Sequence, residues 1–216
     1  MNNLFEFDKQ IKKDCDYIIG TDEAGRGPGA GSVFAAAVCF TSINDDLILE
    51  LSKLNDSKQL TEKVREELFD VIVKNSLYSI VQGSVEQIET LNILRTSLLM
   101  MNNSCSEVIE KLGLKNVLVL VDGNKKIPEF SYNQQTIVKG DSKSASIAAA
   151  SILAKVARDR YMNELDKEYP MYGWRKNKGY MTKEHLIAVD KYGLTKWHRK
   201  SFFKNHFEKS QQLSFL

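Results

Sequence analysis

The chain has 216 residues, of which 43% are hydrophobic and 27% charged, and its formal net charge is +2. This length and composition allow one substantial core, and no low-complexity linker divides the chain, so we expect one domain with a short tail. The three cysteines lie far apart, which excludes a disulfide framework and a CxxC metal knuckle. The first residues lack the layout of a signal peptide, and no apolar run reaches membrane-spanning length, so we expect a cytoplasmic protein without a membrane partner.

Basic residues gather toward the C-terminus. Residues 171–216 hold ten Lys or Arg against three Asp or Glu, a net charge of +7, whereas the residues before them carry −5. Trp174, Tyr180 and Trp197 are interleaved with these basic residues. A basic segment that contains aromatic residues suits a polyanionic partner, although a solvated surface explains a bias of this size equally well.

The first half of the chain begins with two predicted strands, residues 17–22 and 32–40, joined by a Gly-rich loop. A helix over about residues 61–73 and a third strand over 77–83 follow. Apolar residues then recur every three or four positions over residues 88–112. This spacing predicts one long amphipathic helix whose apolar face belongs to the core.

The second half of the chain alternates strands with helices. A buried-strand run ends at Asp122, and a short strand over residues 136–138 leads to Asp141. Apolar spacing predicts a helix over about residues 144–165 and a shorter helix over 183–191. Strands that come first and then alternate with helices indicate a mixed β-sheet flanked by helices, of the α/β class.

Carboxylates mark the ends of three predicted strands: Asp22 with Glu23, then Asp122, then Asp141. Acidic side chains are costly inside a core unless they are paired or bind metal, and neighbouring strand ends can bring them together. Mg²⁺ prefers hard oxygen ligands, and two such ions roughly 3.5–4 Å apart can activate water and stabilise the leaving oxygen of a phosphodiester. The four carboxylates are therefore candidate metal ligands.

Each carboxylate also has a purely structural explanation. Asp141 precedes a predicted helix and fits an N-cap, and Asp122 precedes a glycine and fits a turn. Glu23 can pair with Arg26. The Gly-rich loop at residues 25–31 lacks the Walker and dinucleotide-binding spacings, so it is a weak nucleotide-binding signal. Its glycines would nevertheless let a nucleic-acid backbone approach the main chain closely.

The combination of motifs is more specific than any one of them. Six motifs occur in order: GTDEAGRGP at 20–28, NDSKQL at 55–60, VDGN at 121–124, KGDSKSASIAAASILAKV at 139–156, KGYMTKEH at 178–185 and HRKSF at 198–202. This sequence resembles bacterial ribonuclease HII, the type 2 ribonuclease H, from about Tyr17 to Phe203. The sister type, ribonuclease HIII, usually has a lysine at the position of Arg26 and an extra N-terminal domain, so it fits less well.

The resemblance implies a fold, a cofactor and a set of site residues. It implies a ribonuclease H-like domain over residues 1–203, with a helical and basic C-terminal extension, and a tail over 204–216. Asp22, Glu23, Asp122 and Asp141 would be the catalytic carboxylates and would hold Mg²⁺ or Mn²⁺, with two ions in the active complex. The substrate-binding residues that it implies are Gly25, Arg26 and Gly27 at the ribose 2′-hydroxyl, Tyr180 at the junction of RNA with DNA, and Ser57, Lys58, Lys143 and Ser144 near backbone phosphates.

The resemblance also implies an activity. The protein would cut the RNA strand of RNA–DNA hybrids, and duplex DNA on the 5′ side of a single ribonucleotide, leaving a 3′-hydroxyl and a 5′-phosphate. Such an enzyme removes ribonucleotides from DNA. His185 and His198 are the remaining general-acid candidates, with no spacing that assigns either to catalysis. The alternatives are a nucleic-acid-binding module without catalysis and an enzyme that hydrolyses small nucleotides.

Two further features qualify the resemblance. The chain ends in Gln212, Leu213, Ser214, Phe215 and Leu216, which is similar to the short peptides that dock in the apolar pocket of the bacterial sliding clamp, although a frayed end fits equally well. The sequence also departs from the usual family pattern near the loop and the tyrosine motif. The residues concerned are Gly29 for a larger apolar residue, Ser32 for proline, Asn177 for histidine and Met181 for glycine.

Overall fold

A five-stranded mixed sheet forms the centre of the computed structural model, which describes residues 3–113 and 115–213. The strand order is β3-β2-β1-β4-β5. β1 pairs antiparallel with β2 and parallel with β4, so the sheet is mixed as predicted. The strands are β1 (Tyr17–Ala24), β2 (Val33–Cys39), β3 (Leu77–Gly83), β4 (Val117–Asp122) and β5 (Asn133–Ile137).

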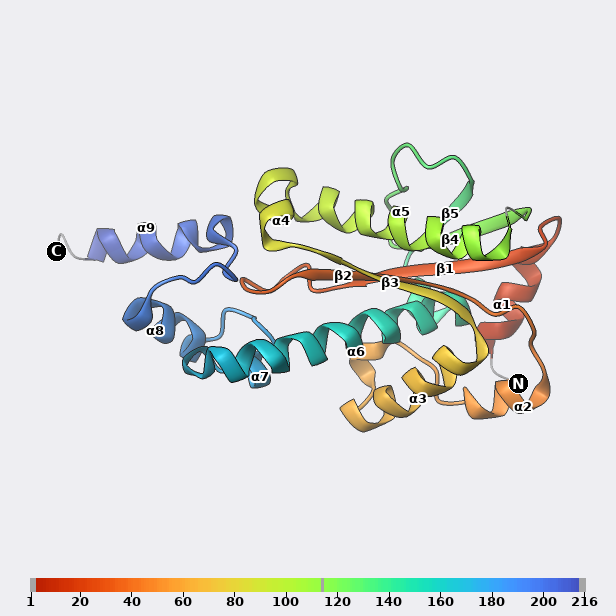
Figure 1. Cartoon of the computed structure of the whole chain (residues 1–216), viewed down its shortest axis with the longest axis horizontal. Coiled ribbons are helices and arrows are strands. Elements are labelled where there is room, and N and C mark those ends of the chain that lie inside the picture. The colour runs from red at the N-terminus through yellow and green to blue at the C-terminus, as the bar shows by residue number, and fades with distance from the viewer. Residues whose placement is uncertain (1–2, 114, 214–216) are drawn as a thin grey trace.

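Helices cover both faces of this sheet (Figure 1). One face packs against α4 (Val85–Leu91) and α5 (Ile93–Leu112), whose apolar residues share a core with β1, β2 and β4. The other face packs against α3 (Glu62–Asn75) and the long α6 (Ala145–Glu168). Two cores therefore sandwich the sheet, which is the α/β architecture that the sequence indicates.

The remaining helices lie at the two ends of the molecule (Figure 1). At one end, α1 (Asn3–Lys12) and α2 (Asp45–Glu50) lie near the start of the sheet. At the other end, a C-terminal lobe contains α7 (Trp174–Asn177), α8 (Lys183–Tyr192) and α9 (Lys204–Leu213). Short 3-10 turns connect these elements: η1 (Ser57–Gln59), η2 (Gly140–Ser142), η3 (Pro170–Tyr172) and η4 (Lys200–Phe203).

The predicted long helix over residues 88–112 is wrong in one respect. It is two helices, because Asn92 adopts a left-handed backbone conformation with φ of +69°. The Asn92 side chain accepts a hydrogen bond from the amide of Arg95 and thereby caps α5. Periodicity alone could not detect this break, because apolar residues continue at helical spacing on both sides of it.

Two strand boundaries also differ from the prediction. β1 continues past Asp22 and Glu23 to Ala24, because Ala24 still pairs with Phe34 of the antiparallel neighbour. β5 starts at Asn133, earlier than predicted, because its first residues are polar and face solvent at the edge of the sheet. An edge strand of this kind lacks the apolar run that marks a buried strand.

Helix α6 crosses the sheet at very short range, which its alanine-rich sequence permits. Gly20 in β1 lies directly under the start of α6, where a Cβ atom would be 2.1 Å from the carbonyl carbon of Ser146. Ala145, Ala148 and Ala149 are fully buried at this contact. The close approach brings the N-terminus of α6 to the edge of the sheet where the carboxylates lie.

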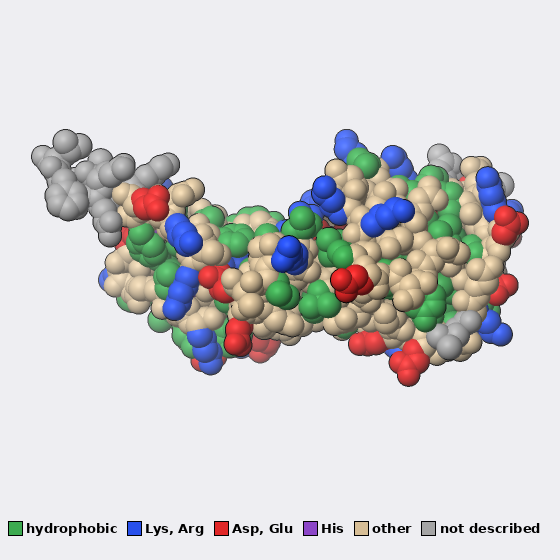
Figure 2. All heavy atoms as spheres, turned by 90° about the horizontal axis from the view of Figure 1, so that it is seen from above, with side chains coloured by type: hydrophobic (Ala, Val, Ile, Leu, Met, Phe, Trp, Pro, Cys, Tyr) green, Lys and Arg blue, Asp and Glu red, His purple; other side chains and the backbone are tan. Residues whose placement is uncertain are grey.

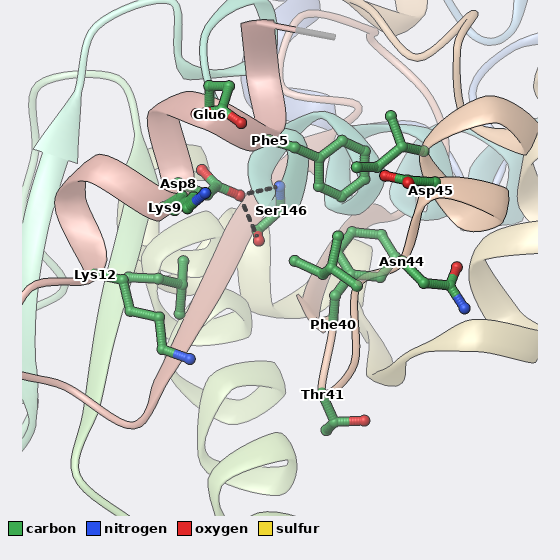
Figure 3. Close-up of a pocket in the computed structure, with 13 residues that line it drawn as sticks. Phe5, Glu6, Asp8, Lys9, Lys12, Phe40, Thr41, Asn44, Asp45 and Ser146 are labelled. Atoms are coloured by element: carbon green, nitrogen blue, oxygen red, sulfur yellow. Dashed lines mark hydrogen bonds between the residues drawn. The ribbon is translucent and has the colours of Figure 1, made fainter. Parts of the chain in front are cut away.

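Helix α1, which the sequence analysis did not predict, is anchored to the start of α6. The buried Asp8 carboxylate accepts hydrogen bonds from the amide and the hydroxyl of Ser146, at 2.8 and 2.7 Å (Figure 3). Burial raises the pKa of Asp8, although its bonds to Ser144 and Ser146 oppose this shift. A cavity of about 520 Å³ lies beside this contact, between α1 and α2, with Phe5 and Phe40 among its walls.

Candidate active site

Two of the four predicted carboxylates lie side by side at the ends of parallel strands. Thr21 of β1 is paired with Val121 of β4, so the next residues in register are Asp22 and Asp122. Both side chains point to the α6 face, because residues of the same parity on these strands pack on that face against Ile147. Asp22 is only 6% exposed. The sheet itself therefore places two carboxylates next to each other.

The other two predicted carboxylates come from the flanking segments. Glu23 follows Asp22 in β1, and its carboxylate pairs with Arg26 at 3.2 Å, as one structural alternative predicted. Asp141 lies in η2, which is tied to β4 because the amide of Gly140 donates to Asp122 at 2.7 Å. Asp141 is not an N-cap, since Ser144 caps α6. Its position beside Asp122 thus serves the cluster.

Burial and the repulsion between like charges both shift the pKa values of this cluster. Burial raises the pKa of Asp22 well above its ordinary value, and the charges of Glu23 and Asp122 raise it further. Burial and then the charge of Asp122 also raise the pKa of Asp141. Burial raises the pKa of Glu23, although Arg26 opposes the shift. A cation between these groups would relieve the repulsion.

The donor set of this cluster fits hard divalent cations. All four groups offer carboxylate oxygens, the ligands that Mg²⁺ and Mn²⁺ prefer. Within the described residues, no three acidic, His or Cys side chains are already closed around a metal position. Instead, Asp122 accepts from Gly140, Glu23 from Arg26, and Asp22 from the amide of Glu23 at 2.7 Å. A cation at this site would share these oxygens with their present donors or replace those donors.

A groove of about 510 Å³ runs from Glu23, the one carboxylate of the four that lines it, along the Gly-rich loop to Tyr180. Lys58 lines this groove. Burial alone would lower its pKa, but the charges of Asp56, Asp22, Asp141 and Asp122 together raise the pKa above its ordinary value. Ser57 is buried on the groove wall and shares a hydrogen bond of 2.9 Å with Ser151 of α6. The predicted residues Ser57 and Lys58 therefore lie in the same groove as Glu23.

Two buried arginines hold the Gly-rich loop in place. Arg199 is fully buried and donates to four carbonyl oxygens of the loop, those of Gly25, Arg26, Pro28 and Gly31, at 2.7–3.2 Å. Arg158 is also buried and donates to the carbonyls that follow, at Ala30 and Ser32. Each guanidinium can make up to five such bonds in a fixed geometry. The carbonyls of the loop are therefore drawn inward.

Drawing the carbonyls inward leaves loop amides for a ligand. In the described part of the chain, the amides of Gly25, Arg26 and Gly27 donate no hydrogen bond. Gly25 has φ of +101°, and a Cβ atom there would meet the Arg158 side chain at 2.1 Å. A Cβ atom at Gly27 would contact the Tyr180 ring at 3.3 Å. The loop amides and the half-exposed Tyr180 ring thus share one wall of the groove.

Two predicted substrate-binding residues lie elsewhere. Ser144 is fully buried as the N-cap of α6, so its hydroxyl does not reach the surface. Lys143 is exposed, but its ammonium donates to the carbonyl of Val138 and does not line the groove. His185 and His198, the general-acid candidates, are buried in the C-terminal lobe and bonded to each other. They do not line the groove either.

Two of the departures noted in the sequence analysis, at Gly29 and Met181, are explained by the packing of these residues against each other. Met181 stands where glycine is usual and Gly29 where a larger apolar residue is usual. A Cβ atom at Gly29 would lie 2.7 Å from Cγ of Met181 and 2.9 Å from the ring of Phe203. The Met181 side chain therefore occupies the space that a larger residue 29 would fill. The two departures compensate each other.

The sequence analysis missed several residues of this site. Arg158, Lys155 and Ser151 belong to α6 and line the groove. Lys155 is bonded to Asp159 at 2.6 Å, and burial lowers the pKa of Lys155. Helical spacing marks the apolar face of α6 but does not show which polar residues of the helix meet the loop. Arg199 lies more than 160 residues from its partners, so no local pattern could reveal its role.

Comparison with solved structures supports the class of protein. The RNase HII in the structure of the PCNA:RNase HII complex from Archaeoglobus fulgidus matches with a TM-score of 0.68 and 26% identity, over 85% of this chain and 93% of that one. Bst-RNase HIII in complex with Mn²⁺ matches with a TM-score of 0.63 at 17% identity, over 82% and 63%, which shows the shared fold. The fold is that of the ribonuclease H class.

Sequence comparison then narrows the class. The Ribonuclease HII family model matches residues 19–210. Ribonuclease HII from Fusobacterium nucleatum is 46% identical over 98% of this chain and 95% of its own length. Ribonuclease HII from Caldicellulosiruptor bescii is 47% identical over 94% and 95%. The chain therefore belongs to the ribonuclease HII family.

This membership decides between the alternatives left open by the sequence. The protein is a metal-dependent nuclease that hydrolyses phosphodiesters, so neither a binding module without catalysis nor an enzyme for small nucleotides fits. Separately, none of the helices among the described residues is both long and apolar enough to cross a membrane.

Proposed function

We propose that the protein cuts the RNA strand of RNA–DNA hybrids, and duplex DNA on the 5′ side of a single embedded ribonucleotide. The observation that carries this proposal is the groove in which Glu23 lies beside the amides of residues 25–27 and the ring of Tyr180. Acidic groups suit metal-assisted hydrolysis, and free amides can donate hydrogen bonds to the oxygen of the ribose 2′-hydroxyl, the group that distinguishes RNA from DNA. Removal of ribonucleotides from DNA in the cytoplasm follows as the biological role.

The residues of the site have distinct parts in the proposed reaction. Asp22, Glu23, Asp122 and Asp141 would hold two divalent ions, Mg²⁺ or Mn²⁺. When bound, these ions supply Lewis acidity that activates the attacking water and stabilises the leaving oxygen. The amides of Gly25, Arg26 and Gly27 position the ribose, and no side-chain nucleophile is required. The products are a 3′-hydroxyl and a 5′-phosphate.

Substrate grip is proposed to come from positive charge around the groove. Lys58 lines the groove near several carboxylates and can approach a backbone phosphate. Figure 2 shows a hollow between the C-terminal lobe and the lobe that contains the sheet, with Lys and Arg side chains on its rim. The basic C-terminal segment lies on one side of this hollow. Binding to a duplex should therefore weaken as salt concentration rises.

The test of the proposed function compares three duplexes of one sequence: all DNA, DNA with one ribonucleotide, and an RNA–DNA hybrid. With Mg²⁺ or Mn²⁺, the protein is expected to cut the second and third and to leave the first intact. The Asp122→Asn variant should cut none of them, because it weakens the metal ligands while keeping an acceptor for the amide of Gly140. Cutting of the all-DNA duplex would contradict the proposed recognition of the 2′-hydroxyl.

We also propose that the tail binds a bacterial sliding clamp. The Archaeoglobus fulgidus structure is a complex of PCNA, a sliding clamp, with an RNase HII, which supports a clamp as partner. In this chain the backbone of α9 extends to Leu213, and Ser214, Phe215 and Leu216 lie outside the described residues. In this proposal the domain over residues 1–203 cleaves the substrate, and the tail over 204–216 tethers the enzyme to the clamp.

Deletion of residues 212–216 is expected to abolish binding to the clamp and to leave cleavage of the single-ribonucleotide duplex unchanged. Two terminal apolar side chains and their neighbours would supply the anchor in an apolar pocket. Surface plasmon resonance with immobilised clamp measures the first effect, and a cleavage assay without clamp measures the second. Unchanged affinity for the clamp would refute the tether.

A further inference from the structure

The C-terminal lobe contains a polar chain in its most buried part, directly behind Tyr180. His185 and His198 are 0% and 1% exposed, and Tyr172, Trp174 and Phe203 surround them. Burial lowers the pKa of both histidines, that of His198 to about 4. Both imidazoles are therefore neutral at pH 7, and each carries one ring proton.

The partners of these imidazoles fix the position of each proton. The amide of Thr195, which can only donate, points at Nδ1 of His198 at 2.9 Å. His198 therefore carries its proton on Nε2 and donates it to Nε2 of His185 at 3.1 Å. The indole of Trp174, also an obligate donor, reaches the same Nε2 of His185 at 3.1 Å. That nitrogen must be an acceptor, so the proton of His185 lies on Nδ1.

The other end of the chain requires the same assignment. Nδ1 of His185 lies 2.9 Å from the carbonyl oxygen of Tyr180, which can only accept. The amide of Thr182 also donates to this carbonyl, at 2.8 Å. A donor at one end and an acceptor at the other therefore dictate one direction of hydrogen bonds, from Thr195 through both histidines to Tyr180.

The backbone conformation around the Tyr180 carbonyl determines where the Tyr180 ring lies. The turn before it contains Lys178 and Gly179, both at positive φ. The carbonyl of Gly179 accepts from the amides of Gly29 and Ala30, which joins the turn to the Gly-rich loop. Without the bond from His185, the Tyr180 carbonyl would keep only the amide of Thr182, and rotation of this peptide would carry the ring away from Gly27.

We infer that His185 is a positioning residue for Tyr180, and that His198 maintains the tautomer of His185 that this role requires. The inference rests on the proposed function, in which Tyr180 recognises the junction of RNA with DNA. Neither histidine touches the groove, so neither acts on the substrate directly. They hold the distance between the ring of Tyr180 and the loop amides that contact the ribose.

Two substitutions at one position separate positioning from structural support. In His185→Asn, the amide nitrogen occupies the place of Nδ1 and keeps the donor to Tyr180, but Trp174 and His198 lose their acceptor. In His185→Gln, the side-chain oxygen occupies the place of Nε2 and keeps that acceptor, but the bond to Tyr180 is lost. The asparagine variant leaves two buried donors unpaired and should be the less stable of the two.

The two variants are expected to rank in opposite order for thermal stability and for substrate selectivity. His185→Gln should lower the ratio of kcat/KM on single-ribonucleotide DNA to kcat/KM on the hybrid roughly five- to tenfold, the size of one lost hydrogen bond. His185→Asn should have the lower Tm but keep this ratio within about twofold of wild type. A purely structural role predicts that selectivity follows Tm in both variants, and that result would overturn the inference.

Tyr180→Ala separates failure of the inference from failure of the proposed function. If this variant keeps the wild-type selectivity ratio, the proposed role of Tyr180 is wrong and the inference fails with it. If it lowers the ratio while His185→Gln does not, the inference alone fails. In the double variant, the glutamine should cause no further loss of selectivity beyond that of Tyr180→Ala.

A measurement on the wild-type protein tests the tautomers even if a variant does not fold. Two-bond ¹⁵N–¹H correlation spectra of the histidine rings distinguish a proton on Nδ1 from one on Nε2. At neutral pH, His185 should carry its proton on Nδ1 and His198 on Nε2. A proton on Nε2 of His185 would break the chain to Tyr180 and overturn the inference.

Discussion

Replacing Asp22 by Asn is expected to lower metal-dependent cleavage by roughly a thousandfold or more, about 4 kcal/mol in activation free energy. The variant removes the charge of a proposed metal ligand, which lies next to Asp122 in the register of the sheet. The amide keeps an oxygen that can accept from the amide of Glu23. The loss should therefore appear in kcat at saturating substrate, with the fold intact.

The same substitution is expected to stabilise the metal-free protein. Burial and neighbouring charges raise the pKa of Asp22 above its value in the unfolded chain. A raised carboxyl pKa means that the folded state loses stability as pH rises through that pKa, so ionised Asp22 weakens the fold at neutral pH. Removing the charge should increase the free energy of unfolding by about 0.5–2 kcal/mol.

Urea unfolding at pH 7 with a chelator, and then with Mn²⁺, measures this effect. Without metal, Asp22→Asn should unfold at a higher urea concentration than wild type. With Mn²⁺, wild type should gain more stability than the variant, because binding to the folded state alone stabilises it. A metal-free variant that is less stable than wild type would show that the Asp22 carboxylate stabilises the fold. That result would contradict the expectation that ionised Asp22 weakens the metal-free protein.

Replacing Arg199 by Met should lower the free energy of unfolding by about 3–5 kcal/mol and remove most of the activity. The side chain is fully buried, and its guanidinium satisfies four carbonyls of the Gly-rich loop. Methionine fills a similar volume but leaves these acceptors without a donor. Without these hydrogen bonds, the loop would no longer be held with its amides toward the groove.

A matched substitution separates the buried arginine from an ordinary one. Arg160 is exposed and pairs with Glu66 on the surface, so Arg160→Met should cost less than about 1 kcal/mol. Arg199→Lys should fall between the two, because an ammonium keeps the charge but reaches fewer carbonyls. Chemical denaturation gives all three values. An Arg199→Met protein with wild-type stability and activity would show that the loop is held by other contacts.

The sheet and the candidate carboxylates were predictable from the sequence for a simple reason. Buried strands such as residues 117–122 are marked by continuous apolar runs, and an acidic residue after such a run stands out. That β1 and β4 are parallel neighbours, which brings Asp22 and Asp122 together, is shown by the structure and not by the spacing of the residues. The mixed sheet and its flanking helices follow from the same periodicity.

Long-range polar contacts could not be predicted in this way. Arg199 and Arg158 meet the Gly-rich loop across most of the chain, and nothing in their local sequence differs from a surface arginine. The two histidines looked like general-acid candidates because a sequence does not show burial, and the structure encloses both. The break at Asn92 could not be predicted because the sequence does not show whether an asparagine caps a new helix or continues the existing one.

The most direct test of the central claim is the position and chemistry of the nick in a duplex with one ribonucleotide. Wild-type protein with Mg²⁺ or Mn²⁺ should cut once, on the 5′ side of the ribonucleotide, and leave a 3′-hydroxyl and a 5′-phosphate. Both chelator and Asp122→Asn should abolish the cut. A nick on the 3′ side of the ribonucleotide with a cyclic phosphate end, or a cut that persists in chelator, would contradict a carboxylate-held metal site that hydrolyses this bond.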